Sequence, residues 1–518
     1  MAGRAQPVSA VPGIGVAAAI AALILGSILA VALRAEAGRG FSAADWAAVR
    51  FTITQAALSA VFSVALAVPV ARALARRVFW GRRVLITLLG APFILPVIVA
   101  VLGLLEVFGR NGWVSGLLGL AGLEPINIYG LHGVVLAHVF FNLPLATRLI
   151  LQGWHDIPAE RFRLAAQLGC GPGEIWSLLE RPMLMRTVPG AAMIIFAICL
   201  TSFAVALTLG GGPRATTVEL AIYQAFRFDF DLSRAALLSC VQIALAGAAA
   251  LVALRVTRLD GFGGGLDRAV QRWDAKTAWL LWQDRIVIAA AAAFLLLPLA
   301  AIVLSGLGGV SLLPMSVIEA TVTSLVVALG STALLVLIAV PLALSLALRP
   351  RGGLELVGLL GLVASPLVIG TGLFIVINPV TDPFALALPV TALVNAVMAL
   401  PFALRALVPG ARDVIASYGR LGLSLNMQGG AFLRLVVLRR LRPQIGFAAG
   451  LAAALSMGDL GIIALFADPE RATLPLQMYR LMGAYQMEAA AAAGLILMVL
   501  SLALFWLFDR GGRIHAGA

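Results

Sequence analysis

Charged residues are scarce in this chain, and several signatures of soluble proteins and enzymes are missing. Asp, Glu, Lys and Arg make up 12% of the 518 residues, whereas 61% are hydrophobic. No soluble fold can bury so large an apolar fraction, so the bilayer must be the solvent. Cys170, Cys199 and Cys240 show no CxxC spacing, which argues against a disulfide framework or a metal site. No GxxxxGKS/T motif is present, so we expect no ATP hydrolysis by this chain, no catalytic residue and no cofactor.

Basic residues outnumber acidic ones, and the formal net charge is +13. A nucleic-acid-binding surface would explain this charge, but in a membrane protein an arginine excess is expected from positively charged cytoplasmic loops. The arginines gather in loops of one parity, beginning with the loop around 72–83, and the opposite loops are poorer in arginine or balanced by acidic residues. We therefore predict a multi-pass inner-membrane protein with both termini in the cytoplasm, surrounded by lipid and without a nucleic-acid partner.

Twelve apolar runs are long enough to cross the bilayer, which takes about 20 helical residues. The six in the first half lie at approximately 12–33, 51–74, 84–108, 131–151, 188–209 and 235–254. The six in the second half lie at approximately 286–307, 320–348, 354–377, 385–407, 445–466 and 489–508. The first run could be a signal peptide, but it is longer than the roughly 7–15 apolar residues of a signal core, so we interpret it as a retained helix.

A long polar stretch, rich in arginine, occurs twice. The first repeated segment is 144–182 and the second is 401–439, and the two align position by position without a gap. Proline, arginine, aspartate and leucine recur in register. An even number of spans in each half gives both halves one orientation, which predicts a pseudo-two-fold axis along the membrane normal. The predicted units are 1–254 and 286–518, joined by a glycine-rich cytoplasmic connector at 255–285.

The two halves differ in one hairpin on the predicted external side. Pro96 and Pro366 occupy matching spans, but they are further apart in the sequence than Pro144 and Pro401, which begin the repeated segments. The first half therefore carries thirteen extra residues between Pro96 and Pro144, which we place at about 111–130.

The repeated segments are more than topological signals. Positive charge alone would account for the arginines, but it does not require the same spacing in both halves. A pair of equivalent docking elements on the cytoplasmic side would require the same spacing, because a partner with two-fold symmetry would contact both elements.

The repeated segments resemble the EAA loop of the permease subunits of binding-protein-dependent ABC importers. In that family Glu-Ala-Ala is followed by a glycine four residues on and a proline thirteen residues after the glycine. The resemblance implies ATPase-coupling roles for two sets of positions, Arg163, Leu164, Ala165, Gly169 and Pro182 in the first segment and Arg420, Leu421, Gly422, Asn426 and Arg439 in the second. Both segments carry arginine where the family has glutamate. Asn tolerates positive φ better than other non-glycine residues, so we expect Asn426 to preserve the turn.

A narrower resemblance involves residues 202–242 and 456–466, which are similar to parts of the fused permeases of thiamine and thiamine pyrophosphate importers. The resemblance implies a tandem pair of six-helix units, a cytoplasmic ABC ATPase homodimer and a periplasmic thiamine-binding protein as partners. Related fused permeases carry ferric iron, which is the alternative cargo. A twelve-helix secondary transporter is a further alternative, but it gives no reason for the matched segments.

Four residues are candidates for the substrate pathway. Asp459 lies inside the eleventh predicted span, where an ionised carboxylate costs about 2.5–3.5 kcal/mol, so it either faces a pathway for a cationic substrate or caps a helix end or pairs with an arginine. Glu219, Tyr223 and Tyr479 lie on the predicted external side. The tyrosines could gate the pathway or anchor the protein at the membrane interface. His132, His138 and His155 are too scattered to suggest a metal site.

Overall fold

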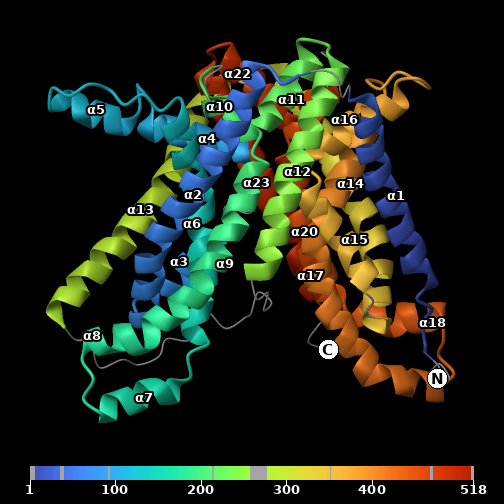
Figure 1. Cartoon of the computed structure of the whole chain (residues 1–518), viewed down its shortest axis with the longest axis horizontal. Helices are drawn as coiled ribbons and strands as arrows, with labels where there is room; N and C mark the ends of the chain where they lie inside the picture. The colour runs from blue at the N-terminus through green and yellow to red at the C-terminus, as the bar shows by residue number, and fades with distance from the viewer. Residues whose placement is uncertain are drawn as a thin grey trace.

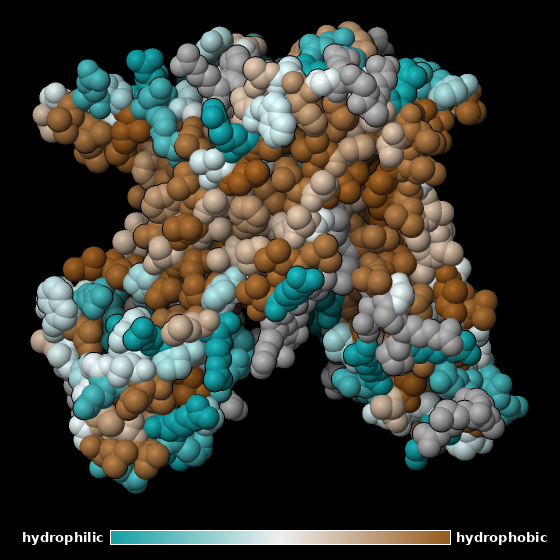
Figure 2. All heavy atoms as spheres, viewed as in Figure 1, coloured by the Kyte–Doolittle hydropathy of each residue, from teal (hydrophilic) through white to brown (hydrophobic). Residues whose placement is uncertain are grey.

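The computed structural model describes residues 6–35, 40–90, 94–212, 215–256, 277–349, 352–466 and 471–514. Across these ranges the chain is helical and contains no β-strand. Figure 1 shows long helices running between a compact upper end and a lower end that divides into two legs. In Figure 2 apolar residues form a belt around the middle, hydrophilic residues gather at both ends, and the surface is hollowed between the legs. The prediction of an all-α polytopic membrane protein is confirmed.

The helices follow one another with short connections. Those of the first half are α1 (Val11–Arg34), α2 (Ala43–Arg76), α3 (Arg82–Leu88), α4 (Val97–Phe108), α5 (Trp113–Leu120), α6 (Leu131–His155), α7 (Ala159–Gln167), α8 (Pro172–Ile175), α9 (Arg181–Leu200), α10 (Ala204–Leu209), α11 (Val218–Arg227) and α12 (Leu232–Val256). Those of the second half are α13 (Ala278–Gly309), α14 (Met315–Leu348), α15 (Gly352–Val363), α16 (Pro366–Ile377), α17 (Ala387–Ser424), α18 (Gly430–Phe432), α19 (Leu438–Arg440), α20 (Arg442–Met457), α21 (Gly461–Phe466), α22 (Leu474–Gly483) and α23 (Met487–Arg513). Two π-helical turns, η2 (Trp176–Glu180) and η6 (Leu433–Val437), and one 3₁₀ turn, η5 (Val310–Leu312), complete them.

Eleven helical segments of the described chain are long and apolar enough to cross a membrane, one fewer than the twelve predicted. The difference arises at the predicted ninth span, 354–377, which is divided into α15 and α16 of 12 residues each. Ser365 caps α16 by accepting a hydrogen bond from the Val368 amide at 3.2 Å, and Pro366 has no N–H to continue the preceding helix. The predicted third span, 84–108, is also interrupted, because α3 ends at Leu88 and α4 begins at Val97.

The first helix of each half packs against the other half. The helix α1 lies on α14, α15 and α16 of the second half, whereas α13 lies on α2 and α4 of the first half as well as on α23 of its own half (Figure 1). Both crossings are close at a glycine: a Cβ on Gly372 would lie 2.4 Å from the Ser27 carbonyl oxygen, and one on Gly103 would lie 2.5 Å from the Pro298 carbonyl oxygen. The predicted units 1–254 and 286–518 are therefore interlocked in space. Of the predicted connector, 255–285, residues 257–276 lie outside the described part of the chain.

The extra residues of the first half form an additional helix. Between α4 and α6 lie residues 109–130, whereas the matching connection between α16 and α17 contains only residues 378–386. The longer connection contains α5, which projects from the upper end of the molecule (Figure 1). The predicted excess in this hairpin is confirmed.

Candidate functional site: paired segments and a closed pathway

Each repeated segment forms one of the two legs and turns back at a left-handed residue. The turn after α7 has Gly169 at φ +70°, and the turn after α17 has Asn426 at φ +53°. The Cys170 amide donates to the Ala165 carbonyl at 3.0 Å, and the Met427 amide donates to the Gly422 carbonyl at 2.8 Å. These bonds satisfy carbonyl groups at the end of each helix, so both turns are Schellman caps. The expectation that Asn426 preserves the glycine turn is confirmed.

The legs expose leucines at matched positions. Leu164, Leu168 and Leu178 of the first segment are 56%, 72% and 65% exposed. Their counterparts in the second segment are Leu421, Leu425 and Leu435, which are 54%, 61% and 51% exposed. These six side chains, called the paired leucines below, surround turns of the same geometry at the polar lower end (Figures 1 and 2). The legs therefore present two similar apolar surfaces outside the apolar belt, of the kind that binds a partner protein.

Four of the remaining predicted coupling residues are accessible on the same legs. Arg163 and Arg420 lie exposed on α7 and α17, one residue before the first of the paired leucines. Pro182 and Arg439 are also exposed, beyond the π-helical turns η2 and η6. The two π-helical turns occupy equivalent positions in the segments, and such turns are frequent at functional sites.

The other two predicted residues, Ala165 and Gly422, are buried inside the legs. Their size limits the side chains that can pack beside them. Ala165 lies in the segment that contains Ile175, whereas Gly422 faces Phe432, the counterpart of Ile175. A Cβ on Gly422 would lie 2.6 Å from the Phe432 ring. The smaller residue of the second leg thus accommodates the larger ring, and the two legs bury similar side-chain volumes.

The first leg is fastened to the membrane helices by ion pairs. Arg72 Nε of α2 lies 2.7 Å from Glu180 Oε2, and the Arg72 guanidinium stacks on the Trp176 ring at 4.8 Å. Arg76 and Arg77 both lie 2.7 Å from the Asp284 carboxylate of α13. The arginines predicted as topology signals therefore also hold α2, α13 and the first leg together.

Asp459 caps a short helix inside the membrane. It lies in the break between α20 and α21, and its Oδ1 accepts a hydrogen bond from the Gly461 amide at 3.1 Å. Its Oδ2 is buried and has no hydrogen-bond partner among the described residues. A Cβ on Gly461 would lie within 4 Å of both Asp459 Oδ1 and the Phe203 ring, so the carboxylate reaches the contact between the two halves. This geometry agrees with the helix-end interpretation of Asp459.

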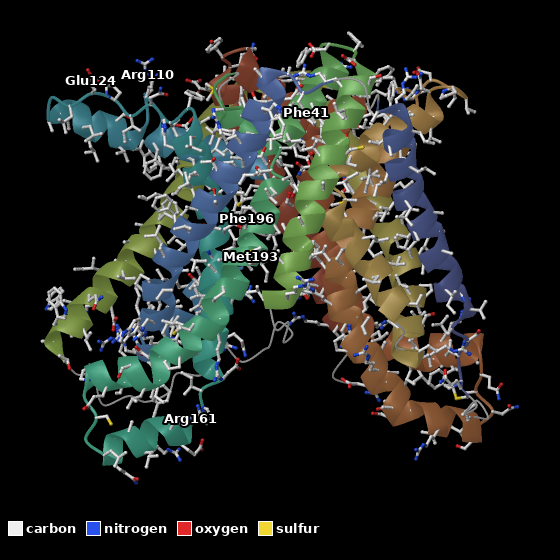
Figure 3. All side chains as sticks on the ribbon, in the orientation of Figure 1. Phe41, Arg110, Glu124, Arg161, Met193 and Phe196 are labelled. Carbon is white, nitrogen blue, oxygen red and sulfur yellow. The ribbon has the colours of Figure 1, made fainter. Side chains whose placement is uncertain are left out.

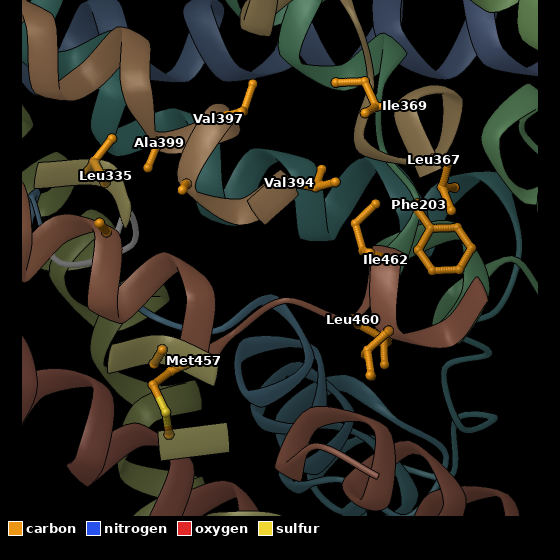
Figure 4. Close-up of a cluster of buried hydrophobic side chains, with 14 of the residues drawn as sticks. Phe203, Leu335, Leu367, Ile369, Val394, Val397, Ala399, Met457, Leu460 and Ile462 are labelled. Carbon is orange, nitrogen blue, oxygen red and sulfur yellow. The ribbon is translucent and has the colours of Figure 1, made fainter. Parts of the chain in front are cut away.

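Aromatic and aliphatic side chains close the contact between the halves. The Phe203 ring packs edge-on against Tyr223 at 5.3 Å between centroids, and Tyr223 packs against Phe228 at 5.7 Å. Figure 4 shows Phe203 beside Leu460 and Ile462 of the second half. Tyr223 is only 8% exposed, so its ring packs inside the protein.

Equivalent hydrogen bonds position α11 and α22 at this upper end. The Val218 amide donates to Thr52 Oγ1 at 2.9 Å, and the Leu474 amide donates to Ser324 Oγ at 2.7 Å. Tyr479 of α22 packs against the same hydrophobic cluster that contains Phe203 and Tyr223. The structure therefore brings Tyr223, Tyr479 and Asp459 toward the same contact between the halves.

Glu219 lies deeper than predicted. It is 1% exposed and sits on α11, which lies outside the eleven candidate spans. Burial raises the pKa of the Glu219 carboxyl to about 8. Burial therefore favours the protonated form of this carboxyl.

Sequence reasoning missed Glu180 and Asp284. Both are acidic residues beside apolar runs, and neither lies in a recognised motif. Glu180 could have been found by comparing the two repeated segments, because its counterpart is Val437. The pattern of apolar spans did not indicate that α1 would pack against the second half and α13 against the first.

The fold and the paired legs define a multi-pass transport permease of the ABC importer class. Curated thiamine transport system permease proteins, ThiP, are similar over nearly the whole chain. Those of Brucella abortus strain 2308, Salmonella typhimurium strain LT2 and Escherichia coli strain K12 are 41%, 39% and 38% identical, covering 95%, 100% and 98% of this chain and 93%, 99% and 98% of the relative. The chain belongs to this family of thiamine transport system permease proteins.

A more distant relative matches only part of the chain. The molybdenum transport system permease protein ModB of Mycobacterium bovis is 32% identical over 212 residues, which cover 40% of this chain. No family model matches the sequence.

Proposed function

We propose that the chain is the translocation subunit of an ATP-driven importer that moves thiamine, thiamine pyrophosphate or both across the bacterial inner membrane. The names and full-length similarity of the ThiP relatives support the cargo. The matched exposure of the paired leucines on the two legs is the observation that supports coupling to a partner.

The proposed energy source is a cytoplasmic ABC ATPase homodimer that binds one leg with each subunit. The paired leucines fill apolar grooves of the ATPase, and Arg163 and Arg420 contact its polar rim. A two-fold ATPase fits two legs of similar shape. Closure of the dimer would draw the legs together, and the interlocked halves would transmit this movement to the contact around Phe203.

The proposed topology places the legs and both termini in the cytoplasm. The start of α1 and the end of α23 lie at the same end of the molecule as the legs, which agrees with this topology (Figure 1). The pseudo-two-fold axis relating the units 1–254 and 286–518 would run between the legs. A periplasmic binding protein would deliver the cargo at the opposite end.

The proposed pathway runs through the contact between the halves. In the conformation seen here the aromatic cluster of Phe203 and Tyr223 closes it. When the halves separate at this level, the Tyr223 and Tyr479 rings become available to stack on a pyrimidine. The carboxylate of Asp459 then offers a negative charge to a cationic thiazolium, with Glu219 as a second carboxyl nearby.

The test is ATP-dependent uptake by proteoliposomes that contain the chain and its ATPase, with labelled thiamine offered through its binding protein. Leu168→Asp and Leu425→Asp each introduce a charge into the proposed groove contact, so we expect each to lower ATPase binding and uptake at least about tenfold. Val78→Asp is the matched control, because Val78 is 78% exposed and outside the repeated segments. It should transport normally.

Three outcomes would overturn parts of the proposal. Uptake of ferric iron but not thiamine would retain the coupling and reject the cargo. Uptake driven by a proton gradient without ATPase would reject the class. Equal losses in the Val78→Asp, Leu168→Asp and Leu425→Asp variants would show that the leucines have no special part in docking.

A further inference from the structure

The helix α5 has no counterpart in the second half and leaves an apolar face uncovered. Its sequence, WVSGLLGL, contains no charged residue over Trp113–Leu120. Trp113, Leu117 and Leu120 follow one another at helical spacing and are 40%, 67% and 87% exposed. One of the eleven candidate spans, Val97–Leu120, covers both α4 and α5, but α4 ends at Phe108. The separate helix α5 has eight residues and is about 12 Å long, too short to cross the bilayer.

The hairpin that carries α5 is fixed rather than loose. The buried Ser115 hydroxyl donates to the Gly109 carbonyl at 2.7 Å and accepts from the Ile126 amide at 3.1 Å. One side chain therefore ties α5 to the connection on both sides of the helix, so the direction of α5 is set by the protein.

The surroundings of α5 indicate what covers its apolar face. Figure 1 shows α5 lying across the direction of the long helices, level with their upper ends. In Figure 2 the lower side of the hairpin that carries α5 is apolar and faces the level of the apolar belt, whereas the upper side of this hairpin is hydrophilic. Arg110 and Glu124, the charged residues that flank the helix, stand on the upper side (Figure 3). The hairpin therefore keeps its charged residues on the upper side and the apolar helix on the lower side, which is the arrangement expected of a segment that lies in a membrane interface.

We propose that α5 is an interfacial arm whose apolar face, formed by Trp113, Leu117 and Leu120, inserts into the phospholipids of the leaflet opposite the legs. Under the proposed topology this is the external leaflet, so the inference relies on that topology for the side of the membrane only. Trp113 lies at the depth of the headgroups, as tryptophan prefers. The arm braces the first half of the chain against the membrane, and the second half has no equivalent.

The test uses nitroxide labels on the full chain in liposomes. Leu120→Cys and the matched control Glu124→Cys are made in a background carrying Cys170→Ser and Cys240→Ala, with the buried Cys199 retained. Accessibility to oxygen, which concentrates in lipid, is compared with accessibility to a water-soluble nickel chelate. We expect the Leu120 label to favour oxygen over the chelate at least about fivefold more than the Glu124 label.

Equal chelate accessibility of the two labels would overturn the proposal. So would a Leu120 label that is open to water until the binding protein is added, because the face would then belong to a protein contact. Both labels lie at exposed positions, so neither substitution is expected to disturb folding. Reduction of the Glu124 label by external ascorbate reports the side of the membrane, so an error in the proposed topology would be seen without changing the depth of Leu120.

Discussion

Arg72 and Glu180 form a buried ion pair that joins α2 to the first leg, with 2.7 Å between Nε and Oε2 and no exposed surface on the Glu180 side chain. The Trp154 indole N–H also reaches Glu180, at 3.4 Å from Oε1. In the second leg the corresponding contact with the membrane helices contains no charged residue. The counterparts of Glu180 and Trp154 are Val437 and Ala411, and the position matching Arg72 is Leu344, all buried apolar side chains.

This comparison predicts opposite results for single and double substitutions. Glu180→Gln leaves the Arg72 guanidinium without its carboxylate, so we expect a loss of about 3–5 kcal/mol in stability and a strong loss of ATP-dependent uptake. The double variant Arg72→Leu, Glu180→Val introduces the second leg's residues at both positions of the ion pair, with Trp154 retained, and should recover most of both the stability and the uptake. Apparent melting temperature in detergent and uptake in proteoliposomes are the measurements. A double variant no better than Glu180→Gln would show that the charge itself is required.

The sequence determines much of the architecture because hydrophobic length is a direct physical requirement of the bilayer. Ten of the predicted spans correspond to long helices of the structure, and the repeated segments do form equivalent turns. The predicted helix ends were less accurate. The helix α17 continues through the second segment to Ser424, whereas α6 ends at His155 before Pro158, and the counterpart of Pro158 is Ile415. Pro158 disfavours helical backbone at the residue before it, where the first leg turns, whereas α17 continues past Ile415 even though it contains Pro401 and Pro409.

Contacts between distant segments could not be predicted in the same way. The packing of α1 and α13 against the opposite halves depends on close approaches at Gly372 and Gly103. Glycine occurs in apolar spans for many other reasons, so these two residues did not identify the contacts. Asp459 was identified because a carboxylate in an apolar run is costly, but its helix-capping role required the break before α21 to be known.

The turns of the two legs predict a graded response to side-chain shape. Gly169→Val and Asn426→Val place a β-branched residue at positive φ, so each should cost about 1–3 kcal/mol and reduce ATPase binding. Asn426→Gly should be neutral or slightly stabilising. Gly173→Ala is the control, because Gly173 lies in the same leg without positive φ and with open space around it. Melting temperature and pull-down with the ATPase distinguish these outcomes, and a Gly169→Val variant that binds normally would contradict the prediction.

The packing of Gly422 against Phe432 predicts a compensating pair. Gly422→Ala adds a Cβ at 2.6 Å from the ring, so overpacking of about 1–3 kcal/mol should exceed the gain of about 1 kcal/mol in helix propensity. Phe432→Ile in the same chain gives the residues that occupy the matching positions of the first leg, Ala165 and Ile175, and should restore the melting temperature. If Gly422→Ala alone raises the melting temperature, the ring has room to move and the argument fails.

Substitutions of Asp459 can separate the effect of its negative charge from the effect of its helix-capping hydrogen bond. Asp459→Asn retains an oxygen that can accept from the Gly461 amide, so α21 should keep its start and the melting temperature should change little. The negative charge is lost, and we expect thiamine uptake to fall about tenfold or more while ATPase binding to the legs is unchanged. Asp459→Ala removes both cap and charge, and it should lower uptake and also cost about 1 kcal/mol in stability. Uptake, ATPase pull-down and melting temperature are measured side by side on both variants. Unchanged uptake by Asp459→Asn would remove this carboxylate from the substrate pathway and leave it only as the cap of α21.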